Sequence, residues 1–216
     1  MNAVAVEGVW KYYGDYPALR DVRMEAAAGQ CLALIGRNGA GKTTLLRIIA
    51  GFSAAQRGKI KIWGKEPREA ETRRQMGFLG HGISVYDELS ALENLVLFGK
   101  LYGLPDPRKS ALEWLERTGL ERVRNGLVRE FSRGMRQRLA VARAFLHDPT
   151  VLLLDEPFTA LDDRAIAVLQ RLLREALELA SHVALLSRGQ LAFHGERTAE
   201  MVEDPGYVYA RYGEGA

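Results

Sequence analysis

Cysteine is almost absent from this 216-residue sequence, and long apolar runs are missing altogether. The single cysteine, Cys31, cannot form an internal disulfide, which excludes the disulfide-rich secreted scaffolds. No apolar stretch approaches the roughly 18 residues that a transmembrane helix needs. The first ten residues, MNAVAVEGVW, lack the basic and apolar regions of a signal peptide. We therefore expect a cytosolic protein.

A large excess of one charge is also lacking. The chain has 30 basic and 27 acidic residues, for a formal net charge of +3. The two signs are mixed within segments such as REAETRR and ERVRNGLVRE, as on solvated helix faces. This mixture argues against nucleic acid as a partner. A hydrophobic content of 47% is enough for the core of one large domain.

The order of the predicted elements indicates an α/β protein. Alternation of apolar and polar residues predicts half-buried strands near the N-terminus, and short apolar runs at 31–36 and 151–157 predict buried strands. Helical periodicity, punctuated by proline and glycine, covers about 87–147. A last hairpin should turn near Arg188–Gly189. We expect an antiparallel β start, a parallel α/β core and an inserted helical block.

One segment carries the pattern of a phosphate-binding loop. GRNGAGKT, from Gly36 to Thr43, fits G-x-x-x-x-G-K-[ST] completely, follows a buried strand and opens a helix. Its backbone N–H groups and the helix N-terminus would hold phosphate oxygens. Lys42 would reach the β and γ phosphates, and the Thr43 hydroxyl would ligate Mg²⁺. The predicted ATP-binding set in this segment is Gly36, Asn38, Gly39, Ala40, Gly41, Lys42, Thr43 and Thr44.

Two acidic residues end the second buried strand, in VLLLDEP. The carboxyl ends of strands in an α/β sheet face the ligand crevice. Carboxylates there would be costly unless a metal and a reaction used them. We predict that Asp155 supports Mg²⁺ and that Glu156 is the general base for an attacking water.

The segment FSRGMRQRLAVARAFLHDPTVLLLDEPFTALD resembles the ATP-binding subunits of ABC transporters, and the resemblance covers nearly the whole chain. It implies the ABC ATPase fold over 1–216, a P-loop NTPase core. Residues 1–80 and 148–216 would form the nucleotide-binding α/β core with its N-terminal antiparallel β subdomain. Residues 81–147 would form the inserted helical subdomain. The implied activity is ATP hydrolysis that powers transport, at the cytoplasmic face of the membrane.

The resemblance also implies an ATP-dependent homodimer and an integral membrane permease partner. Ser132 and Gly134 fall on the signature motif, which contacts the γ-phosphate held by the partner chain, although Arg133 replaces the usual glycine. Asp162 ends a loop that crosses the dimer interface. Tyr13, 23 residues before Gly36, matches the aromatic residue that stacks on adenine, with Tyr12 and Tyr16 as rivals.

His81 departs from the family pattern, which usually has a glutamine there that contacts Mg²⁺. The sequence GHGISVYDELSALENL resembles the subgroup for cytochrome c maturation, also described as haem exporters. The segment SRGMRQRL also occurs in ATPases of the ABC-2 exporter group. We expect His81, as a neutral imidazole, to bind a water held by Mg²⁺, and a surface histidine at the partner interface is the alternative role. The sequence thus favours haem export, with another ABC-2 exporter as the alternative.

The histidine that contacts the γ-phosphate in this family has no counterpart in the sequence. His182 stands just before the strand that begins at Val183, where the family has an arbitrary residue. We predict that roughly fifteen to twenty residues, which include the strand that carries this histidine, are missing from the sequence between about 172 and 179, since an empty slot in a parallel sheet would expose apolar neighbours. The alternative is one long helix, in which case the chain would be a nucleotide-binding module that does not hydrolyse ATP.

Overall fold

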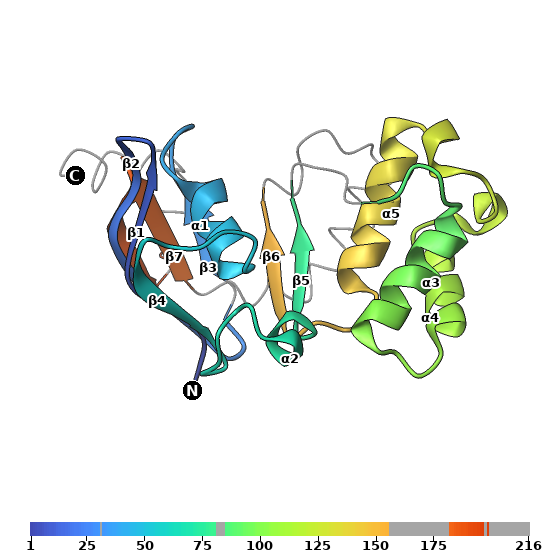
Figure 1. Ribbon diagram of the computed structural model, residues 1–216, viewed down its shortest axis with the longest axis horizontal. Coiled ribbons are helices and arrows are strands. Elements are labelled where there is room, and N and C mark those ends of the chain that lie inside the picture. Colours follow the sequence, from blue (N-terminus) through green and yellow to red (C-terminus); the bar gives the residue numbers. More distant parts are fainter. Residues whose placement is uncertain (31, 81–84, 156–181, 197, 199–216) are drawn as a thin grey trace. The chain divides into compact units, whose positions relative to one another are not determined.

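The computed structural model describes residues 1–30, 32–80, 85–155, 182–196 and 198 (Figure 1). The chain divides into two compact units, 1–73 with 175–216, and 74–174. The sequence-based division, with 81–147 inserted between 1–80 and 148–216, stays a prediction. No helix in the described part of the chain is both long enough and apolar enough to cross a membrane.

The first unit begins with an antiparallel sheet. Strand β1 (Asn2–Tyr13) lies between β2 (Tyr16–Ala27) and β4 (Arg57–Ile62). Alternate residues along these strands are buried, because successive side chains of a strand point to opposite faces. The fully buried side chains of this sheet include Val6, Val9, Leu19, Val22 and Ile62. The two N-terminal strands that the alternation predicted are therefore confirmed.

A second sheet in this unit has the order β3-β7-β8. Strands β3 (Leu32–Ile35) and β7 (His182–Ser187) run parallel, and β8 (Gln190–Glu196) returns antiparallel to β7. Arg188 and Gly189 both have positive φ, +46° and +80°, as the favoured two-residue hairpin turn requires. The hairpin predicted from the sequence is confirmed. Helix α1 (Lys42–Ile49) follows β3 and buries Leu45, Ile48 and Ile49 on one face; a short helix, α2 (Ala70–Arg73), ends the first part of the unit.

The second unit combines two parallel strands with three helices. Strands β5 (Met76–Leu79) and β6 (Val151–Leu154) pair in register from Met76 opposite Val151. Helices α3 (Ala91–Tyr102), α4 (Pro107–Arg117) and α5 (Arg133–Phe145) pack together (Figure 1), with single helical turns η1 (Glu121–Val123) and η2 (Val128–Glu130) between α4 and α5. Their common core includes Leu95, Leu115, Leu120 and Leu139.

Capping residues explain where these helices begin. Ser90 and Glu93 form a capping box at α3, in which each side chain accepts a hydrogen bond from the other residue's backbone N–H. Asp106 caps α4 and Pro107 occupies its first turn, where proline costs no hydrogen bond. The helices predicted within 87–147 are confirmed. The long helix that is the alternative to a missing segment near 172–179 lies outside the described residues.

Candidate phosphate site and signature helix

The predicted phosphate loop leaves the carboxyl end of β3 and enters α1. Gly39 and Gly41 have φ of +81° and +103°, in the left-handed region that glycine adopts without strain. A Cβ on Gly41 would lie 2.7 Å from the Ala18 carbonyl oxygen and 2.8 Å from Leu19 Cδ2. The loop therefore needs glycine at Gly41 both for its conformation and for its close contact with β2.

Lys42 lies over this loop rather than away from it. Its ammonium Nζ donates to the carbonyl oxygens of Gly36, at 2.6 Å, and Arg37, at 3.1 Å. No acidic residue occupies the first turn of α1, so the positive end of the helix dipole and the Lys42 charge add together. Thr43 is exposed in the same turn. This cation-rich, acid-free set of donors fits a phosphate group.

The β7–β8 turn supports the loop from behind. The backbone N–H of Gly189 donates to the Ala40 carbonyl at 3.1 Å, and its carbonyl accepts from Arg20 N at 2.7 Å. The Arg20 guanidinium also donates to the Arg188 carbonyl at 2.8 Å. A Cβ on Gly36 would lie 2.4 Å from the Leu186 carbonyl oxygen. Sequence reasoning found the hairpin but missed its role as a support, because nothing local to the turn indicates which loop it meets.

The three candidate tyrosines differ in their surroundings. Tyr12 is half-buried and stacks on Trp10 with ring centroids 6.1 Å apart. Tyr13 is 55% exposed, and Lys11 Nζ lies 5.6 Å from its ring centroid. Tyr16, opposite Tyr13 across the hairpin, is 61% exposed. Tyr13 and Tyr16 thus present accessible rings, and the assignment of Tyr13 to adenine stays a prediction.

Asp155 follows β6 directly, as predicted, and is only 5% exposed. Its backbone N–H donates to the Leu79 carbonyl at 2.8 Å, which extends the pairing of β5 with β6 by one residue. A carboxylate at that depth is stabilised by a cation or by hydrogen bonds, in keeping with the predicted Mg²⁺-supporting role. The predicted residues Glu156, Asp162 and His81, and the proposed gap near 172–179, lie outside the described residues.

Ser132 and Gly134 lie at the start of α5. Ser132 is the N-cap: its Oγ accepts from the backbone N–H of Met135 at 3.2 Å. Gly134 lies in the first turn, which contains no acidic residue, and Arg133 beside it is exposed. The start of α5 therefore carries free helical N–H dipoles and positive charge, the electrostatics that favour an anion.

His182 lies at the wrong end of its strand for a phosphate contact. It pairs with Leu32 at the amino end of the parallel strands β3 and β7, and its Nε2 lies 3.3 Å from Gln30 Nε2. The phosphate loop follows the carboxyl end of β3, about 10 Å further along at 3.3 Å per residue. This position supports the prediction that His182 does not sense the γ-phosphate.

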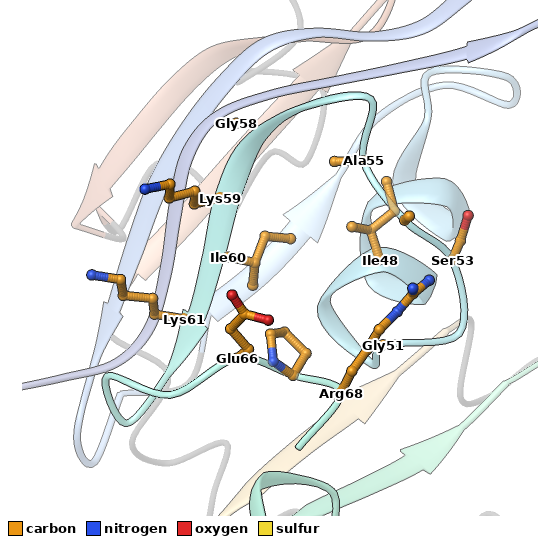
Figure 2. A pocket seen from close by; sticks show the side chains of 12 residues that line it. Ile48, Gly51, Ser53, Ala55, Gly58, Lys59, Ile60, Lys61, Glu66 and Arg68 are labelled. Carbon is orange, nitrogen blue, oxygen red and sulfur yellow. The ribbon is translucent and has the colours of Figure 1, made fainter.

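A hollow of about 200 Å³ lies at the other end of α1 (Figure 2). Ile48 and Ile60 face it from α1 and β4, and Glu66 and Arg68 lie at its edge. Its lining residues all lie between Ile48 and Arg68 in the sequence, and none belongs to the loop at 36–43. The hollow is therefore distinct from the phosphate loop.

Comparison with known proteins agrees with these observations. Residues 19–159 match the family model described as ABC transporter. The chain is 34% identical to the ABC transporter ATP-binding protein NatA of Bacillus subtilis, over 89% of each chain. It is 32% identical to the Nod factor export ATP-binding protein I of Cupriavidus metallidurans, over 88% of this chain and 70% of that protein. It is also 34% identical to the sulfate/thiosulfate import ATP-binding protein CysA 2 of Rhizobium meliloti, of which it spans only 61%.

Solved structures give the same answer. A structure of an ATP-binding subunit of an ABC transporter superimposes with a TM-score of 0.82 and 28% identity, over 99% of this chain and 95% of that one. A dimeric ATP-binding cassette in a post-hydrolysis state, bound to ADP and phosphate, superimposes with a TM-score of 0.77 and 26% identity, over 90% and 99%. With the phosphate loop, the buried Asp155 and the capped signature helix, these matches lead to one conclusion: the chain belongs to the ABC transporter family, as an ATP-binding subunit with ATPase activity and the cassette fold.

Proposed function

We propose that this chain is the ATPase of an ABC-2 type exporter and works as an ATP-dependent homodimer on a membrane permease. The observation that carries the ATP-binding step is the phosphate loop, on which Lys42 Nζ lies and after which the first turn of α1 contains no acidic residue. Gly36 and Gly41 leave no room for a Cβ beside the Leu186 and Ala18 carbonyl oxygens, so the loop packs closely against β7 and β2.

Within one chain, cationic and acidic side chains have different roles in hydrolysis. Lys42 neutralises the β and γ phosphates, and Glu156 takes a proton from the attacking water. Thr43 and Asp155 would hold Mg²⁺, and His81, as a neutral imidazole, would contact a water bound to it. The metal, when bound, withdraws charge from the phosphate oxygens. Glu156 and His81 enter this scheme from their places in the sequence alone.

Between two chains the signature helix completes the site. Ser132 and Gly134 of one protomer would contact the γ-phosphate bound by the phosphate loop of its partner. Tyr13 would stack on the adenine, and Asp162 would end the loop that crosses the interface. The support for this arrangement is the serine-capped, acid-free start of α5 and the similarity to a dimeric cassette bound to ADP and phosphate.

Two candidate types of exporter follow from two observations. The similarity to a Nod factor export protein over 88% of this chain favours an ABC-2 exporter. The sequence Gly80-His81 followed by LSALENL favours the haem-export subgroup of cytochrome c maturation as the second candidate. Because the membrane subunit binds the cargo, the chain itself carries no cargo site in either scheme.

Transport direction tests the proposal. The chain, placed at the cytoplasmic face, should copurify from detergent-solubilised membranes with a protein of about six apolar spans. The pair, reconstituted in vesicles with ATP on the outside, should move substrate away from the ATP side, into the vesicles. Movement toward the ATP side would identify an importer, and a pair that responds to haem alone would select the second candidate.

A further inference from the structure

The Arg136 side chain makes three contacts, two of them to the backbone just before the signature serine. Its Nε donates to the Phe131 carbonyl at 3.3 Å and one terminal nitrogen donates to the Arg129 carbonyl at 2.9 Å. The other terminal nitrogen pairs with Asp87 Oδ1 at 3.0 Å. Because guanidinium is planar with donors in fixed directions, these bonds together fix the turn that leads from Arg129 into Ser132.

Asp87 belongs to a segment that is itself held firmly. Arg129 N donates to the Asp87 carbonyl and Val128 N to the Leu89 carbonyl, each at 3.0 Å, so residues 87–89 and 128–129 lie side by side. The fully buried Asn94 accepts from Tyr86 N at 2.7 Å and donates to the Tyr86 carbonyl at 2.9 Å. Segment 85–90 is therefore anchored to α3 through Tyr86 and to α5 through Asp87.

A neighbouring ion pair provides a natural comparison. Arg129 and Glu88 are also 3.0 Å apart and join the same two segments. Their side chains are 54% and 77% exposed, against 26% for Arg136 and 53% for Asp87. The Arg129 guanidinium makes no backbone hydrogen bond within the described residues, so this pair has the geometry of a solvated surface bridge, which contributes little.

We propose that Arg136 is a positioning residue for the signature motif. Its guanidinium holds the backbone at Arg129 and Phe131 so that Ser132 and the first turn of α5 take a fixed orientation, and Asp87 keeps the guanidinium in place. Segment 85–90, which follows the His81 region, thereby moves together with Ser132. This inference rests on the proposed function, in which Ser132 contacts nucleotide held by the partner chain.

The test compares Arg136→Gln and Asp87→Asn with Arg129→Gln and Glu88→Gln in the full chain. Arg136→Gln should lower kcat for ATP hydrolysis by roughly 10- to 100-fold, because a displaced positioning group costs rate, while the affinity of the monomer for ATP stays unchanged. Asp87→Asn should cause a smaller loss. The double variant should be no slower than Arg136→Gln alone, since both changes remove the same Arg136–Asp87 interaction. Arg129→Gln and Glu88→Gln should match the parent protein.

Amide hydrogen exchange without nucleotide separates this idea from the proposed function. Arg136→Gln should speed exchange at residues 132–136, and the two comparison variants should not. Arg136→Lys keeps the charge but loses the planar set of guanidinium donors, so it should show most of the loss of kcat and most of the faster exchange. Any of three results would overturn the positioning role. These are full recovery of kcat in Arg136→Lys, losses of kcat that multiply in the double variant, and unchanged amide exchange at residues 132–136 in Arg136→Gln. A parent chain without ATP hydrolysis would overturn the proposed function, while the exchange result would still decide the role of Arg136.

Discussion

His147 is a half-buried histidine whose ring makes both a stacking contact and a hydrogen bond. It stacks on Tyr102 with ring centroids 3.7 Å apart, and its Nε2 donates to the Met76 carbonyl at 3.1 Å, so the neutral ring carries its proton on Nε2. Nδ1 is buried with no hydrogen-bond partner among the described residues. Burial therefore lowers the pKa of His147 and nearby Arg143 lowers it further, while the Met76 carbonyl and Asp148 partly offset the shift.

This histidine should make the protein sensitive to acid. The folded state binds its proton more weakly than the unfolded state does, so the stability due to His147 is complete above the unfolded pKa of about 6.5. That stability is lost as the pH falls from there through the lower folded-state pKa. Thermal unfolding between about pH 7.5 and pH 5.5 should show a smaller fall in Tm for His147→Gln than for the parent. The exposed His194→Gln is the control; equal pH dependence in all three proteins would contradict the prediction.

Lys42 should be indispensable because no other described side chain places a positive charge on the loop carbonyls of Gly36 and Arg37. Lys42→Ala should abolish ATP hydrolysis and weaken nucleotide binding, as measured by phosphate release and by titration with a fluorescent nucleotide. Lys59→Ala, which removes an exposed lysine from β4, should leave both unchanged. Parent-like turnover in Lys42→Ala would refute the phosphate-loop assignment.

At the scale of elements, the phosphate loop depends on a turn far away in the sequence. The Gly189 N–H and carbonyl join Ala40 in the loop to Arg20 in β2, so the β7–β8 hairpin fixes the loop against the first sheet. A loop braced in this way keeps its anion-binding shape without a ligand, which reduces the conformational entropy lost on binding.

Gly189→Ala should test this brace. A Cβ there would lie 2.7 Å from the Ala18 carbonyl oxygen, and φ of +80° adds strain of about 1–2 kcal/mol for a side-chain-bearing residue. We expect a lower Tm and weaker ATP binding. Gly64→Ala is the matched control, because Gly64 has the same φ of +80° but no atom within 4 Å of its Cβ position. If both variants lose the same stability and affinity, backbone strain alone explains the result.

For the whole molecule, the proposed property to test is association driven by ATP. Glu156→Gln should lose roughly 10²- to 10⁴-fold in turnover, as expected for a removed general base, and should still bind ATP. It should therefore accumulate as an ATP-bound dimer that sizing chromatography detects with ATP and Mg²⁺ and does not detect without nucleotide. A monomer under both conditions would count against the two-chain site. A parent chain that binds ATP without hydrolysing it would favour the alternative of a module without its phosphate-sensing histidine.

Local sequence alone determined the chemistry of the phosphate loop, the strands around it and the capped helices. Lys42 and the loop glycines are recognisable because only certain residue types let a backbone wrap around an anion. Ser90 and Ser132 mark helix starts because each serine Oγ accepts a hydrogen bond from the backbone N–H three residues further along the chain. Asp155 after β6 was equally recognisable from the sequence, since a buried carboxylate costs free energy unless a cation or hydrogen bonds stabilise it.

The tertiary structure decided what lies next to these segments. Gly189 supports Ala40 across about 150 positions of sequence, and Arg136 meets Asp87 and the turn before Ser132 only because α5 packs beside the loop that starts α3. No periodicity or motif encodes such a pairing, because the residues that make it are individually ordinary. Their role follows from long-range packing, which sets which backbone carbonyl each donor can reach.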